Sequence, residues 1–138
     1  MKIVLDTNVI IAAFATRGLC HAVFELCLDR FEIILSEPIL KEISVNLNHK
    51  IKLPLRQCDV IVSYLRDNCS MSEIDDVDAS LCRDKSDIHV LGLAERSSAQ
   101  YIITGDKDLL DMASYKNTKI VTPREFWTIL KENQANDR

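Results

Sequence analysis

The chain of 138 residues, with 47% hydrophobic content, is long enough for one domain that buries about two-thirds of the surface its unfolded chain exposes. Its formal net charge of -4, from 17 basic and 21 acidic residues, excludes a broad attraction for nucleic acid or membranes, so a polyanion has to bind at a local patch. The five cysteines form no C-x-x-C pair and no apolar run approaches about 18 residues, so a disulfide framework, a cysteine-zinc site and a membrane span are not expected.

Strand and helix patterns alternate in the first half of the chain. The run from Ile3 to Leu5 is apolar on both faces, which is typical of a strand covered by helices. In chain order, the elements predicted here are a strand at 2–5, helices at 8–15 and 21–30, a strand at 32–35, and helices at 36–48 and 54–68.

The second half continues the alternation after an exposed acidic connection at 71–79 that can carry a short edge strand. The elements that follow are a helix at 86–97 capped by Ser86, a strand at 101–104, a helix at 108–112, a strand at 119–121 and a helix at 123–130. This order predicts an α/β three-layer sandwich with a central, mainly parallel sheet. Residues 1–130 are expected to form a single domain, and residues 131–138 a polar tail.

Acidic residues follow two of the predicted strands. Asp6 comes directly after the first strand, and Asp106 follows the strand 101–104 through Gly105. Because parallel strands bring their carboxyl ends to the same rim of a sheet, both carboxylates are expected at one crevice. The alternative for each residue is a helix N-cap, which contributes about 0.5 to 2 kcal/mol and needs no functional role.

Two further acids lie where a helix should face the core. Asp87 precedes Val90, Leu91 and Ala94 at helical spacing, so its carboxylate belongs to the stripe that faces the sheet. Glu42 flanks the apolar stripe of its own helix, where a glutamate that reaches out to water is the alternative. Like charges that converge in a crevice are relieved by raised pKa values or by a cation, and an all-oxygen set favours Mg²⁺ or Mn²⁺.

The sequence resembles the PIN domain family of metal-dependent nucleases over most of its length. The segments that carry the resemblance are V-L-D-T-N at 4–8, S-E-P-I-L-K-E at 36–42, R-D-K-S-D-I-H-V-L-G-L-A at 83–94, Y-I-I-T-G-D-K-D-L-L at 101–110 and I-V-T-P-R-E-F at 120–126. The resemblance implies acidic catalytic roles for the residues that the pattern analysis selects, namely Asp6, Glu42, Asp87 and Asp106.

The resemblance also implies supporting residues around these acids. It gives Asp108 the role of a minor metal ligand beside Asp6, Asp87 and Asp106, although a cap on the following helix is an equal alternative. Asn8 and Thr104 are implied as supporting residues at the substrate, and Thr7 is implied near the metal or its waters. Lys107 is a candidate phosphate contact because of its place at the rim, with a solubilising surface charge as the alternative. Lys85 stands where many relatives carry proline, which leaves Asp84 and Asp87 as alternatives for the nearer ligand. The helical-face argument favours Asp87.

The resemblance implies a Mg²⁺- or Mn²⁺-dependent endoribonuclease that acts as the toxin of a toxin–antitoxin pair. The unpaired cysteine pattern predicts the cytoplasm as its compartment. Its expected partners are an RNA substrate, an antitoxin protein and a second copy of the chain. Two alternatives belong to other classes, namely a PIN-fold binding module without catalysis and a Mg²⁺-dependent phosphatase-like protein. The phosphatase is disfavoured because Asn8 stands where the haloacid-dehalogenase type needs a second aspartate. His89 is predicted to face away from the crevice, since it lies about 200° from Asp87 around the helix.

Overall fold

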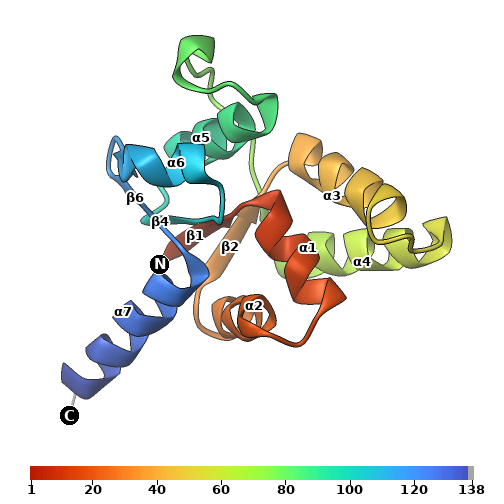
Figure 1. Cartoon of the computed structure of the whole chain (residues 1–138), viewed down its shortest axis with the longest axis horizontal. Coiled ribbons are helices and arrows are strands. Elements are labelled where there is room, and N and C mark those ends of the chain that lie inside the picture. Colours follow the sequence, from red (N-terminus) through yellow and green to blue (C-terminus); the bar gives the residue numbers. More distant parts are fainter. Residues whose placement is uncertain (137–138) are drawn as a thin grey trace.

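The structure, a computed structural model, describes residues 1–136 and the side chains through Gln134. One six-stranded sheet runs through it in the order β3-β2-β1-β4-β6-β5 (Figure 1). All neighbouring strands are parallel except β5, which pairs antiparallel with β6. The strands are β1 (Lys2–Leu5), β2 (Glu32–Leu35), β3 (Ser70–Met71), β4 (Tyr101–Ile103), β5 (Ser114–Tyr115) and β6 (Thr118–Val121). The α/β sandwich with a mainly parallel sheet is confirmed.

Helices flank the sheet on both faces. They are α1 (Thr7–Ala15), α2 (Leu19–Arg30), α3 (Glu37–His49), α4 (Leu55–Asn68), α5 (Lys85–Ser97), α6 (Lys107–Met112) and α7 (Pro123–Asn136). In Figure 1, α5 and α6 lie on one side of the strands, and α1, α2 and α7 lie on the other. No single helix in the described part of the chain is long and apolar enough to cross a membrane, and α1 and α2 reach that length only as a pair bent by 106°.

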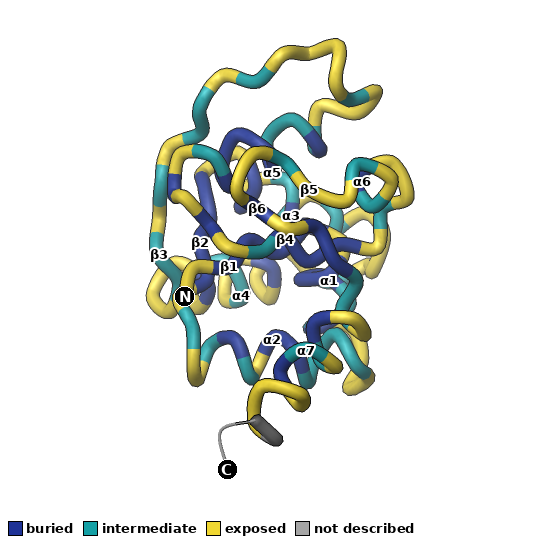
Figure 2. The backbone as a smooth tube through the Cα atoms, turned by 90° about the vertical axis from the view of Figure 1, so that its left-hand side faces the viewer, coloured by how far each residue is buried: buried dark blue, intermediate teal, exposed yellow. Residues whose placement is uncertain are grey.

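The central strand β1 sets the position of the site. Ile3, Val4 and Leu5 are each fully buried, as expected for a strand covered on both faces, and Figure 2 shows the neighbouring strands buried with it. Pairing of Leu5 with Ile103 brings the carboxyl ends of β1 and β4 level. The backbone N–H of Asp6 then donates to the Ile103 carbonyl at 3.0 Å, so the first residue beyond β1 is held beside the end of β4.

The connection from β3 to α5 includes a short 3₁₀ helix, η1 (Ala79–Leu81), and passes closely over α5. The N–H of Asp75 donates to the carbonyl of Gly92 at 3.1 Å. A Cβ atom at Gly92 would lie 2.3 Å from the Asp75 carbonyl oxygen and 2.3 Å from Ile74, so only glycine allows this approach. Figure 2 shows the connection rising from β3 as an exposed and half-buried loop before it reaches the start of α5.

Most element boundaries agree with the sequence predictions to within two residues, and three features need correction. Asp84, not Ser86, is the N-cap of α5, because its side chain accepts from the Ser86 N–H at 2.9 Å. The antiparallel strand β5 was not predicted, since it has only two residues and the positive φ of the following turn falls on Lys116, a residue type that does not indicate such a turn. Helix α7 continues to Asn136 beyond the predicted end at 130, so most of the expected tail is helical, and residues 137–138 lie outside the described residues.

Candidate functional site

Thr104 joins the first two acids at the end of the central strands. It is fully buried, and its hydroxyl donates to Asp6 Oδ2 at 2.7 Å while accepting from the Asp106 N–H at 2.9 Å. Asp106 is the N-cap of α6 and accepts from the N–H groups of Asp108 and Leu109 at 2.7 and 3.3 Å. The parallel strands therefore hold Asp6 and Asp106 on either side of one hydroxyl group.

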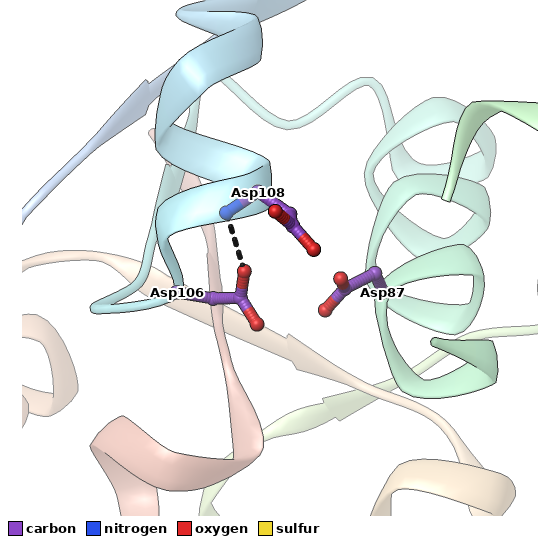
Figure 3. A group of neighbouring side chains, drawn as sticks. All are labelled: Asp87, Asp106 and Asp108. Atoms are coloured by element: carbon purple, nitrogen blue, oxygen red, sulfur yellow. Dashed lines mark hydrogen bonds between the residues drawn. The ribbon is translucent and has the colours of Figure 1, made fainter. Parts of the chain in front are cut away.

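Helix α5 supplies the third carboxylate. Asp87, in its first turn, is 2% exposed, and one oxygen each of Asp87, Asp106 and Asp108 lie within 4.8 Å of one another (Figure 3). Asp84, the alternative to Asp87, is exposed and caps the helix. Asp108 is also exposed, and it does not cap α6, because Asp106 fills that position; the alternative reading of Asp108 as a cap is wrong.

Glu42 reaches the same place from α3. Its carboxylate accepts a hydrogen bond from the Ser86 hydroxyl at the start of α5. A polar pocket of about 260 Å³ lies between these helices and the strand ends. The residues that line it are Asp6, Thr7, Asn8, Glu42, Asn46, Lys50, Asp84, Ser86, Asp87 and Asp106.

Burial and mutual repulsion raise the pKa values of two of these acids. Removal from water is the main cause for Asp87, with the charges of Asp106, Asp6 and Asp84 adding to it, and together they raise its pKa to about 7. Burial also raises the pKa of Asp6, while the hydrogen bond from Thr104 works in the opposite direction. The pocket therefore concentrates more negative charge than it can stabilise without a proton or a cation.

Two polar atoms at the pocket are buried without a hydrogen-bond partner among the described residues, Asp87 Oδ2 and Thr7 Oγ1. Buried polar atoms are rarely left unpaired, so these two indicate a missing ligand. A hard divalent cation with its waters fits an oxygen-only donor set, and Asp87, Asp106, Asp108 and Asp6 are placed to hold it.

The residues predicted at the substrate lie in three different environments. Asn8 is exposed at the pocket wall, whereas Thr104 is fully buried and its hydroxyl already bridges Asp6 and Asp106. Lys107 is exposed on α6 and is absent from the pocket lining. The structure thus places Thr104 behind the carboxylates, where it positions them.

Sequence reasoning missed two pocket residues on α3, Asn46 and Lys50. The sequence spacing could have indicated them, because both residues follow Glu42 at intervals of four and so lie on the same side of the helix as Glu42. His89 is absent from the pocket lining, in keeping with its predicted direction, but it is half-buried, and its Nδ1 atom is buried without a partner among the described residues.

The bridging role of Thr104 leads to a prediction. Thr104→Val removes the hydroxyl donor from buried Asp6, so we expect a loss of about 1 to 3 kcal/mol in the free energy of unfolding and a weaker response to divalent cations. Thr118→Val is the matched control, since its buried hydroxyl donates to the Ala99 carbonyl away from the pocket. Urea unfolding with and without Mg²⁺ measures both effects. Equal Mg²⁺ responses in the two variants would contradict the assignment.

The fold and the site define an α/β protein with an acidic pocket at the carboxyl ends of parallel strands. The profile of the PIN domain family matches residues 2–108, so the chain belongs to the PIN domain family. No curated protein sequence matches the chain.

Solved structures with a similar fold include two VapBC proteins and a VapC toxin. VapBC2 from Rickettsia felis, solved with a promoter DNA fragment, superposes with a TM-score of 0.63 at 13% identity over 87% of this chain and 97% of the other. VapBC-1 from nontypeable Haemophilus influenzae superposes with a TM-score of 0.62 at 14% identity, over 90% of this chain and 99% of the other. VapC20 from Mycobacterium tuberculosis is described as a toxin that cleaves the sarcin-ricin loop. It superposes with a TM-score of 0.55 at 16% identity, over 85% of this chain and 98% of the other. At these identities the likeness shows the fold.

Proposed function

We propose that the protein is a Mg²⁺- or Mn²⁺-dependent endoribonuclease. The observation that carries the proposal is the buried, unpartnered Asp87 Oδ2 beside Asp106 and Asp108, three carboxylates that form no ion pair with a described basic residue. Membership of the PIN domain family supports a nuclease, since the family is one of metal-dependent nucleases.

Each acidic residue has a distinct part in the proposed reaction. A bound divalent ion would supply a water of lowered pKa and would stabilise charge on the leaving oxygen. Asp87 and Asp106 would hold that ion, with Asp108 and Asp6 completing the oxygen set. Glu42, fixed by the Ser86 hydroxyl, is placed to orient the attacking water or to accept its proton. Thr104 keeps Asp6 and Asp106 in register with each other.

We further propose that the protein acts as the toxin of a toxin–antitoxin pair in the cytoplasm. The support is the fold shared with the VapBC structures and with the sarcin-ricin-loop-cleaving toxin VapC20. The chemistry of the pocket is suited to an antitoxin that inserts an arginine or lysine, since either cation would neutralise the carboxylates. Such an insertion would block the cation site and keep the enzyme inactive.

A time course on labelled single-stranded RNA tests the activity. We expect cleavage with millimolar Mg²⁺ or Mn²⁺, loss of cleavage in EDTA, and recovery when excess Mg²⁺ is restored, because no histidine lines the pocket to replace the cation as a base. The alternative of a binding module predicts RNA binding without cleavage under every condition. Cleavage that persists in EDTA would refute a metal-dependent mechanism.

A further inference from the structure

One side of α3 forms a row that leads out of the acidic pocket. Glu42, Asn46 and Lys50 recur every four residues, so their side chains share a face of the helix, and all three line the pocket. Glu42 is bonded to Ser86, and Lys50 is the C-cap residue directly after α3, with its N–H donating to the Asn46 carbonyl at 2.8 Å. Eight residues of helix separate Glu42 from Lys50 by about 12 Å along the axis.

Lys50 is the one basic residue among those that line the pocket in the described part of the chain. Its side chain is exposed, and no described carboxylate lies within 4.0 Å of its ammonium group. Lys41, Lys52 and Arg56 also form no such ion pair, so it is its place in the pocket lining that distinguishes Lys50. Asn46 is half-buried, and its side-chain amide makes no hydrogen bond with a described residue. A free ammonium and a free amide therefore stand together at the mouth of the pocket.

A polyanionic substrate has an electrostatic difficulty at this site. The pocket lining carries the carboxylates of Asp6, Glu42, Asp84, Asp87 and Asp106, and the protein as a whole has a net charge of -4. A strand of RNA that approaches is repelled except where the bound cation and a basic side chain attract it.

We propose that Lys50 and Asn46 bind a phosphate of the RNA strand next to the one that is cleaved, and that they thereby position the scissile bond over the carboxylates. This inference rests on the proposed ribonuclease function and adds a substrate-positioning residue to it. Lys50 supplies the charge and Asn46 supplies a directional donor, as in phosphate contacts that fix the register of a nucleic acid without reading its sequence. The spacing from Glu42 separates the Lys50 contact from the reacting phosphate. Loss of the Lys50 contact should therefore weaken RNA binding more than it slows turnover.

Lys50→Gln tests the proposal, with Lys50→Arg as the rescue and Lys41→Gln as the matched control. Lys41 is an exposed lysine on the same helix that does not line the pocket. We expect Lys50→Gln to raise KM for single-stranded RNA about tenfold with kcat within about twofold, and Asn46→Ala to act in the same direction. The slope of log binding constant against log salt should become shallower by about 0.7, the loss of one phosphate contact. Lys50→Arg should restore both values.

Binding is measured separately in the Asp6→Asn background, by fluorescence anisotropy with a labelled single-stranded RNA in Mg²⁺. This binding measurement tests the phosphate contact independently of the proposed ribonuclease activity. If the wild type does not cleave RNA but Lys50→Gln still weakens binding about tenfold, the ribonuclease proposal fails and the phosphate contact stands. If the wild type cleaves RNA and Lys50→Gln matches Lys41→Gln in KM, binding and salt slope, the inference is overturned. A fall in kcat with unchanged KM also overturns it.

Discussion

Replacing Asp87 by asparagine is expected to lower the rate of RNA cleavage by about three orders of magnitude while leaving the fold intact. The substitution keeps the shape of the side chain but removes the charge that would hold a divalent cation beside Asp106 and Asp108. Loss of an outer partner of a metal ligand commonly costs 10- to 100-fold, so loss of a ligand itself should cost more. Single-turnover cleavage of labelled RNA, with circular dichroism on each variant, measures the effect.

The same loss is expected for Asp6→Asn, Asp106→Asn and Glu42→Gln, because each of these carboxylates lines the pocket. Asp84→Asn provides the matched comparison. Asparagine remains a good N-cap, so α5 should be unaffected, and the exposed Asp84 should matter far less to cleavage than Asp87. If Asp84→Asn abolishes cleavage and Asp87→Asn does not, the assignment of the nearer ligand is wrong.

A substitution away from the pocket tests the specificity of this effect. His89 is absent from the pocket lining, so His89→Ala should change the cleavage rate little. Its buried Nδ1 atom has no partner among the described residues, so His89→Ala can change the free energy of unfolding without bearing on the role of His89 in cleavage. Cleavage that is lost without His89 and retained without Asp6 would point to general acid–base chemistry by histidine and away from the carboxylates.

The gathering of the acids could be predicted because it follows from general geometry. Asp6 and Asp106 meet at the ends of β1 and β4, since parallel strands share one rim, and the register between Leu5 and Ile103 makes the meeting close. Asp87 is buried because it begins the stripe that continues through Val90 and Leu91. In each case a short local pattern determines the direction of the side chain, and the parallel topology of the sheet brings the side chains to one place.

Other parts of the site depend on contacts between distant segments, which a local pattern does not contain. Lys50 reaches the pocket only because α3 runs alongside the start of α5, where Ser86 bonds Glu42. Asp84 and Ser86 are both good capping residues, so the sequence pattern does not distinguish them, and the hydrogen bond from the Ser86 N–H to the Asp84 side chain shows which one caps α5. The roles of all these residues in catalysis stay predictions.

The metal-free protein is expected to lose stability as the pH rises from about 4 to about 7. In the unfolded chain Asp87 releases its proton near pH 3.8, whereas burial and neighbouring charges raise its pKa to about 7 in the folded protein. The folded state therefore binds more protons across this window, and the free energy of unfolding falls with increasing pH. Asp6 shifts in the same direction, again because of burial. Urea unfolding in EDTA at several pH values measures the slope.

Asp87→Asn should remove most of this slope and should be more stable than the wild type near pH 7.5 in EDTA, since it no longer carries the repelled charge. Millimolar Mg²⁺ or Mn²⁺ should stabilise the wild type by binding the folded state alone, with a larger gain at pH 8 than at pH 5, where protons compete for the same oxygens. Asp6→Asn should lose most of that gain. A divalent stabilisation that survives in both Asp6→Asn and Asp106→Asn would place the cation elsewhere in the protein, and the acidic pocket would then need another explanation for its buried, unpartnered oxygen.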